Sequence, residues 1–139
     1  MVLLPTRLAM LQPPRGYLTL AWLGLVANIL IVPFTLGVIL LDPTWRGVHI
    51  AVGSSAVLPT AAVGLVGAIA LLRWRAWGQI VAIVGLSMSL AVALPYGIVR
   101  LALLPEGRPL TAIAAALLWT VNIAALVFWC RPSIRRYLT

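Results

Sequence analysis

Four long apolar runs, separated by short connections that carry charged and proline residues, constrain the fold of this chain more than any other feature of its sequence. A helix needs about 20 predominantly apolar residues to cross the hydrocarbon core of a membrane, and each run is about that long or longer. The short connections require neighbouring helices to run antiparallel. The sequence therefore predicts an all-α integral membrane protein whose transmembrane domain, 17–130, is an up-down bundle of four helices. We expect these spans over 17–41, 49–72, 79–104 and 110–130.

The composition excludes the other large classes of fold. Hydrophobic residues make up 63% of the 139 residues and charged residues 9%, whereas ordinary globular chains are about 45–50% apolar and about 25% charged. This excess of apolar residues rules out both a soluble globular domain and a disordered chain. The single cysteine, Cys130, rules out a framework of disulfides.

Both ends of the chain flank the predicted bundle. The N-terminal segment, 1–16, carries leucines at helical spacing and two prolines after them. We expect a short helix lying in the membrane interface there, and no signal peptide, because the apolar stretch before Pro5 is too short for one. The C-terminal segment, 131–139, holds three arginines and is expected to be a basic tail.

The ten arginines divide unequally between the two ends of the predicted helices. Seven lie at the end that includes both termini, and three lie at the opposite end together with both acids, Asp42 and Glu106. Because cytoplasmic loops carry the excess of positive charge, we expect an inner (plasma-type) membrane protein with both termini in the cytoplasm. The arginines lie at the ends of the apolar runs and do not form a continuous basic surface. This favours contacts with anionic lipids and argues against nucleic acid as a partner.

A shift of the chain by 62 residues aligns several turn and kink residues of its two halves. Pro33 then meets Pro95, and Arg46 meets Arg108. Two explanations remain open. The bundle is a duplicated helical hairpin, or two similar hairpins acquired the same turn and kink residues independently.

Small residues recur at every fourth position of three spans, which lets helix backbones approach closely in an apolar surrounding. These faces are expected either to pack inside the bundle or to contact another subunit. Three of the spans also contain a proline, which is expected to kink each helix: Pro33, Pro59 and Pro95. The small residues at issue are Gly64 in the second span, Gly85, Ser89 and Gly97 in the third, and Ala116 and Thr120 in the fourth.

Two amides, Asn28 and Asn122, fall near the middle of the first and last spans. An amide in hydrocarbon needs hydrogen-bond partners, so the two are expected to bond each other or nearby carbonyls, as structural contacts or as part of a substrate site. The predicted spans hold no Asp, Glu or Lys. This argues against a proton-coupled carrier built on a membrane carboxylate.

One polar cluster is predicted near the end of the helices opposite the termini. Arg100 lies about one turn inside its span, where its long stem could snorkel to the headgroups or its guanidinium could pair with Asp42. We hypothesise a site for an anionic headgroup formed by Asp42, Arg46, His49, Tyr96, Arg100 and Arg108, with Glu106 nearby.

The sequence contains no recognisable set of catalytic residues and no ligands at the spacing of a metal site. We therefore expect no enzyme activity, no metal and no bound cofactor. The single histidine, His49, could serve as an axial ligand to a haem or a chlorophyll-type pigment only with one open ring nitrogen.

The function expected first is that of a non-enzymatic accessory or assembly subunit of a larger membrane complex, partnered by other membrane subunits or by itself. This rests on short loops, no aqueous domain and spare small-residue faces. The alternative is a self-associating carrier or channel for a small solute or a lipid. A second alternative is a pigment- or haem-binding membrane subunit that uses His49.

Overall fold

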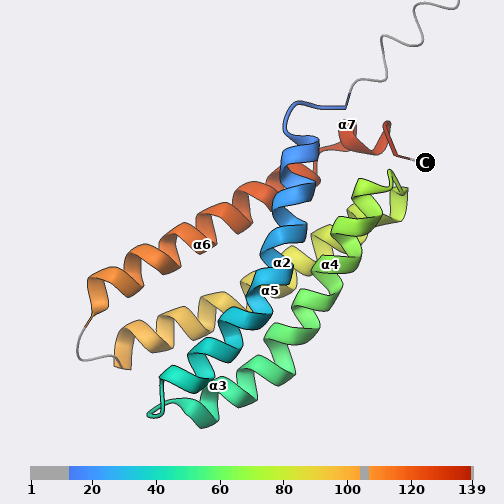
Figure 1. The fold of residues 1–139 in the computed structure, drawn as a ribbon. Helices are drawn as coiled ribbons and strands as arrows, with labels where there is room; N and C mark the ends of the chain where they lie inside the picture. The colour runs from blue at the N-terminus through green and yellow to red at the C-terminus, as the bar shows by residue number, and fades with distance from the viewer. Residues whose placement is uncertain (1–12, 104–106, 139) are drawn as a thin grey trace, which may run out of the picture.

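A computed structural model describes residues 13–103 and 107–138, and all regular structure in these ranges is helical (Figure 1). The expected interfacial helix over 1–16 falls mostly on residues outside the described ranges. The elements are α2 (Tyr17–Leu41), α3 (Arg46–Val52), a π-helical turn η2 (Gly53–Val57), α4 (Leu58–Leu72), α5 (Ala76–Leu103), α6 (Arg108–Trp129) and the short α7 (Pro132–Arg135).

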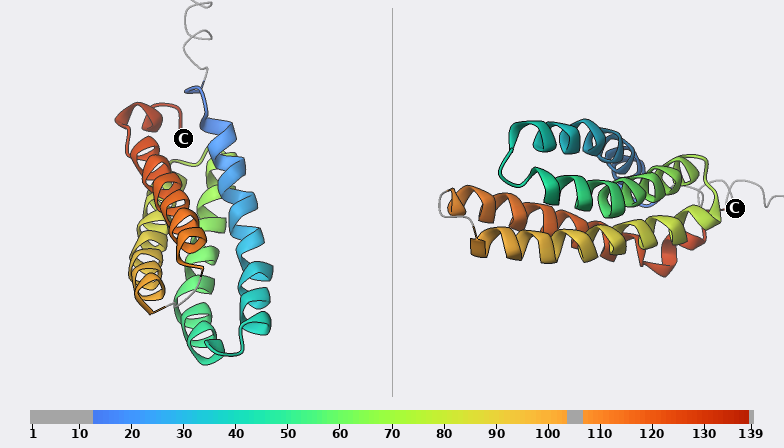
Figure 2. Two further views of the ribbon diagram at one scale, coloured as in Figure 1. Left: turned by 90° about the vertical axis from the view of Figure 1, so that its left-hand side faces the viewer. Right: turned by 90° about the horizontal axis from the view of Figure 1, so that it is seen from below.

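Four helices are long and apolar enough to cross a membrane: α2, the continuous run Arg46–Leu72, α5 and α6. Their most apolar windows have mean hydropathies between 1.9 and 2.4. The prediction of an all-helical chain with four such helices is confirmed for the described residues. Consecutive long helices run in opposite directions (Figures 1 and 2), and each packs on the next in chain order.

The helix bounds differ from the expected ones by a few residues at charged ends. The second run begins at Arg46, three residues earlier than predicted. The Arg46 guanidinium turns back to the end of α2. It donates hydrogen bonds to the carbonyls of Ile39 (3.1 Å) and Leu40 (3.4 Å) at the end of α2. The last run likewise begins at Arg108, followed by Pro109, whose missing N–H costs nothing in the first turn of a helix.

The core of the fold is a direct contact between the backbones of α4 and α5. A Cβ added to Gly67 would lie 3.0 Å from the backbone nitrogen of Ala82, and one added to Gly85 would lie 3.3 Å from the Cα of Gly64. Near the connection between the two helices, a Cβ on Gly78 would lie 2.8 Å from the Cβ of Ala70. Glycine is therefore required for this close approach, and dispersion between tightly packed backbones holds the two helices together.

The predicted small-residue faces divide between the inside and the outside of the bundle. Gly64 and Gly85 face each other across α4 and α5, and Gly97 packs against the ring of Trp119 on α6. Ala116 and Thr120 are exposed on α6, and the Thr120 hydroxyl donates to the Ala116 carbonyl.

A π-helical turn lies directly before Leu58 and Pro59. Proline has no N–H to donate to the carbonyl one turn earlier, and the Leu58 N–H instead reaches back five residues to the Gly53 carbonyl. The hydroxyls of Ser54 and Ser55 donate to carbonyls of the preceding turn, at 2.7 and 2.6 Å. Pro33 and Pro95 lie inside the helices α2 and α5.

Aromatic packing closes the bundle at its arginine-rich end, where both described termini lie. Tyr17 is fully buried, and its hydroxyl donates to the Leu71 carbonyl at 2.7 Å. The Tyr17 ring stacks on Trp74, with centroids 4.7 Å apart, and meets Trp129 edge-on at 5.3 Å. The segment expected as a basic tail folds back here, because α7 inserts Ile134 into the same cluster.

We predict that Gly67→Ala lowers the thermal stability of the purified protein, because the added methyl must push the α5 backbone away from α4. Overpacking of this kind costs about 1–3 kcal/mol. Gly37→Ala in α2 is the matched control, since nothing lies within 4 Å of a Cβ at that position. It should leave the melting temperature unchanged or raise it, because alanine favours helix more than glycine does. Equal melting temperatures for the two variants would contradict the packing argument.

Candidate functional site

A cleft of about 520 Å³ lies between α2 and α6, with α4 and α5 forming its floor. It exists because α2 packs on α4, and α6 on α5, while α2 and α6 make at most marginal contact within the described residues. The cleft extends along most of the bundle, from Tyr96 and Arg100 at one end to Leu71 and Trp129 at the other. Most of its lining is apolar.

The end of the cleft farther from the termini is called the Asp42 end. Four side chains there form a closed ring of polar contacts, which we call the Asp42 ring. His49 Nε2 lies 3.1 Å from Asp42 Oδ2, and His49 Nδ1 lies 2.8 Å from the Tyr96 hydroxyl. Arg100 completes the ring: Nη1 donates to the Tyr96 hydroxyl at 3.4 Å, and Nη2 lies 3.6 Å from Asp42 Oδ2. The ring joins the end of α2 to α3 and α5.

The chemistry of the partners determines the hydrogens of the ring. A carboxylate only accepts, so His49 Nε2 carries a hydrogen, and in the neutral tautomer Nδ1 accepts from the Tyr96 hydroxyl. The pKa of Asp42 lies below its ordinary value, first because His49 hydrogen-bonds the carboxylate. The Trp45 N–H, 3.3 Å from Asp42 Oδ1, and the Arg100 charge lower this pKa further. Asp42 is therefore ionised at neutral pH.

Four of the six residues of the hypothesised headgroup site come together in this ring. Of the two arrangements that the sequence left open for Arg100, the structure has the contact with Asp42. Arg46 instead caps α2 through its carbonyls, and Arg108 begins α6. Glu106 lies outside the described residues. The sequence placed all six near one helix end but could not say which side chains turn toward one another.

Neither ring nitrogen of His49 is open in this structure, because one contacts Asp42 and the other contacts Tyr96. An axial bond to a haem or a pigment would first have to break one of these contacts. Over the ranges 13–103 and 107–138, no three His, Cys, Asp or Glu side chains gather as a metal site would require. Cys130 is exposed.

Further polar groups line the cleft about midway along its length. Asn28 donates to the Gly24 carbonyl at 2.7 Å and Asn122 to the Leu118 carbonyl at 2.8 Å. This confirms the expected bonds to nearby carbonyls, and the two amides do not bond each other. Thr60 also lines the cleft, and the sequence analysis did not single it out. Its position directly after a proline inside an apolar run was the available signal.

No protein-family model matches this chain, and neither a curated protein nor a solved structure matches it. The function must therefore be inferred from the cleft and its polar groups.

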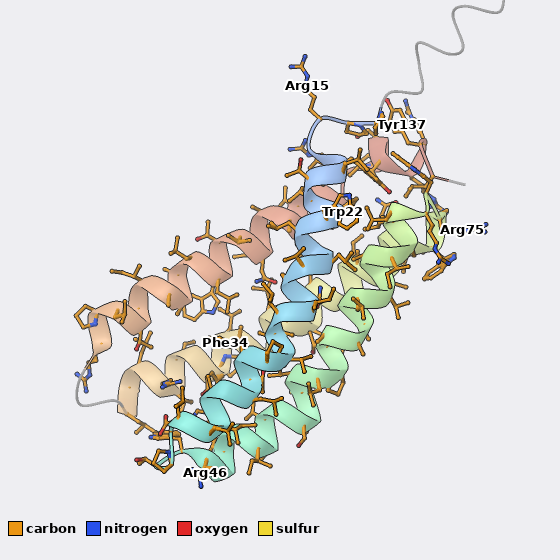
Figure 3. All side chains as sticks on the ribbon, viewed as in Figure 1. Arg15, Trp22, Phe34, Arg46, Arg75 and Tyr137 are labelled. Atoms are coloured by element: carbon orange, nitrogen blue, oxygen red, sulfur yellow. The ribbon has the colours of Figure 1, made fainter. Side chains whose placement is uncertain are left out.

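We predict that Arg100→Ala and Asp42→Ala each lower the melting temperature by a few degrees, and that the double variant loses less than the sum of the two. The two side chains share one contact, so removing the second costs less once the first is gone. Arg75→Ala combined with Asp42→Ala is the control: Arg75 lies at the arginine-rich end, so its effect should add to that of Asp42→Ala (Figure 3). Strict additivity for Arg100 and Asp42 would mean that the guanidinium merely extends toward water.

Proposed function

We propose that this chain is a multi-pass membrane protein, and that its cleft binds a membrane-soluble molecule that enters between α2 and α6. The membrane assignment is supported by the outer faces of the four long helices, which carry large apolar side chains (Figure 3). Phe34 is 66% exposed, and Leu110 is 75% exposed. Patches of this extent are costly in water but not in hydrocarbon.

The arginines support an orientation with both termini in the cytoplasm, as in an inner, plasma-type membrane. Arg15 and Arg75 lie at the arginine-rich end, and Arg46 lies at the opposite end (Figure 3). Asp42 is also at that opposite end, where its carboxylate accepts from the Trp45 N–H directly before Arg46. Anionic lipid headgroups would therefore supply the negative charge at the arginine-rich end.

Cysteine labelling tests this orientation. In a Cys130→Ser background, Thr44→Cys should react with an impermeant maleimide in intact cells, because residue 44 follows α2 at the Asp42 end. Arg75→Cys should react only after the membrane is permeabilised. Both positions are exposed, so a difference in labelling reports the side of the membrane. Labelling of Arg75→Cys from outside would reverse the orientation.

The single observation that carries the binding function is the cleft itself. Its volume of about 520 Å³ falls in the range of about 300–1,000 Å³ that is usual for small-molecule sites. Apolar walls with a few convergent polar groups are also typical of such sites. A molecule dissolved in the bilayer could reach this space from the side without passing through the headgroups. The function is then that of a carrier or a binding protein for a lipid-like molecule.

Both walls of the cleft are fixed without filling it. Trp119 of α6 donates to the Ala93 carbonyl at 3.3 Å and packs on Gly97, while the Asp42 ring holds the far end of α2. A preformed site of this kind loses little entropy on binding. The anionic-headgroup site stays a prediction, and Arg100 would carry it, since it alone of the described arginines lines the cleft.

We predict that Ala114→Phe blocks the cleft and that Ala112→Phe does not. Ala114 lines the cleft, whereas Ala112 is exposed on α6 outside it. The protein in native membrane vesicles is treated with a photoactivatable long-chain hydrocarbon, and the labelled peptides are identified by mass spectrometry. Labelling of cleft residues such as Val38 and Val92 should fall several-fold in Ala114→Phe alone. Identical labelling patterns in both variants would contradict a cleft occupied by a membrane-soluble molecule.

A second candidate function, that of an accessory subunit, is favoured by the poor burial of α2 and α6. None of the most apolar window of α2 is buried, and only 6% of that of α6, against 28% for Arg46–Leu72. A helix of another subunit against either outer face would bury these side chains. Purification in mild detergent distinguishes the candidates: unrelated subunits in constant ratio support the accessory function, and the chain alone with a bound small molecule contradicts it.

A further inference from the structure

Polar side chains from all four long helices line the cleft at a common height. Asn28, Thr60, Ser89 and Asn122 each lie 13 or 14 residues from the Asp42-side end of their helical run. That is roughly 20 Å along a helix. We call these four residues the midway polar cluster.

The glycine contact between α4 and α5 makes room for this cluster. The Asn28 side chain lies directly against Gly64, where a Cβ would come within 2.7 Å of its Cγ. Thr60 is one helical turn before Gly64, and Ser89 is one turn after Gly85, the residue that faces Gly64. The side of the cleft where α2, α4 and α5 meet is therefore polar at this height.

Several hydroxyl groups of these helices bond their own backbone. Thr35 donates to the Ile31 carbonyl and Thr120 to the Ala116 carbonyl, both at 2.7 Å. Thr60 differs in its burial: it is only 9% exposed, and among the described residues its hydroxyl oxygen is the buried side-chain polar atom that lacks a hydrogen-bond partner. The carbonyl four residues earlier belongs to Ala56, inside the π-helical turn.

The other members of the cluster also retain hydrogen-bonding capacity. In the described part of the chain the Ser89 hydroxyl makes no hydrogen bond. The amides of Asn28 and Asn122 each make one, through Nδ2, so their oxygens and second N–H groups remain available. A buried polar group without a partner is costly in an apolar medium, so the Thr60 hydroxyl calls for a polar atom from the occupant of the cleft, and the other members of the cluster can bond the same group.

The group that this cluster would recognise is uncharged. A charge in the middle of a membrane is expensive unless an opposite charge meets it. Arg100, the charged residue that lines the cleft, is 11 residues from Ser89 along α5, roughly 16 Å away. Hydroxyl and amide groups hydrogen-bond neutral oxygens without any balancing charge.

We propose that the occupant of the cleft is a neutral, largely apolar molecule whose carbonyl or hydroxyl oxygen hydrogen-bonds the midway polar cluster, with Thr60 as the main donor. This inference rests on the proposed function, because it names the class of molecule that the same cleft takes. Apolar parts of the molecule extend from the cluster along the cleft toward Tyr96 or toward Trp129.

Three probes of equal chain length test this proposal: a long-chain ketone with its carbonyl in the middle of the chain, the corresponding alkane, and the corresponding fatty acid. Retention of each probe by the detergent-purified full chain is measured by native mass spectrometry. The wild-type protein should retain the ketone better than the alkane. Thr60→Val should weaken ketone retention about two- to tenfold, the effect of one hydrogen bond, and leave alkane retention unchanged.

Two further variants control for folding. Thr60→Ser keeps the hydroxyl and should restore retention of the ketone. Thr35→Val makes the same substitution in the wall of the same cleft, at a hydroxyl that already bonds Ile31, and should not change retention. Melting temperatures of all variants show whether each one folds.

The possible failures are distinct. If no probe is retained, the proposed function fails together with this inference. If the ketone and the alkane are retained equally and Thr60→Val changes nothing, the cleft binds apolar molecules and the inference is wrong. If the fatty acid is retained best and Arg100→Gln abolishes its retention, the occupant is anionic and lies at the Asp42 end, which also overturns the inference.

Discussion

The close approach of the α4 and α5 backbones supports the rest of this structure. At Gly67 and Gly85 the two helices touch backbone to backbone, so that no side chain, not even a methyl group, fits between them without a shift. Helices in an apolar surrounding gain nothing from hiding apolar side chains from each other, and what holds them is dispersion at short range together with hydrogen bonds. A contact between glycines maximises the dispersion attraction, because it lets the two backbones approach closely. The other two long helices are then arranged around this pair.

The cleft follows from that arrangement. α2 contacts the α4 side of the central pair, and α6 contacts the α5 side, so the outer helices stand apart. At the two ends, specific contacts hold α2 to the central pair: the Asp42 ring at one end and the Tyr17 ring cluster at the other. Between these ends neither outer helix has a partner across the gap. A bundle that left such a space for no purpose would lose the dispersion energy of a fourth packed interface.

The polar groups of the cleft sharpen this interpretation. Some hydroxyls in the long helices, such as those of Thr35 and Thr120, bond the carbonyl of the preceding turn. Thr60 makes no such bond among the described residues, and it follows Pro59 and the π-helical turn in the chain. π-Helical turns cost backbone regularity and occur often at functional sites. In this chain the irregular turn and the unsatisfied hydroxyl lie next to each other, on the wall of the cleft, and together they carry the proposal of a neutral oxygen-bearing occupant.

Much of the fold could be predicted from the sequence, because helix length and hydropathy are local properties. The four runs, their bounds to within a few residues, and the pairing of Arg100 with Asp42 could all be inferred from spacing and charge. Contacts that depend on which helix faces turn toward each other could not. The sequence does not indicate that Arg46 caps α2, that His49 bridges Asp42 and Tyr96, or that Ile134 enters the core. Nor does it reveal that α2 and α6 stand apart, since any four apolar helices could close into a complete bundle. Tertiary structure decided this, because the glycines of α4 and α5 bring those two backbones into direct contact, and the outer helices pack on opposite sides of that pair.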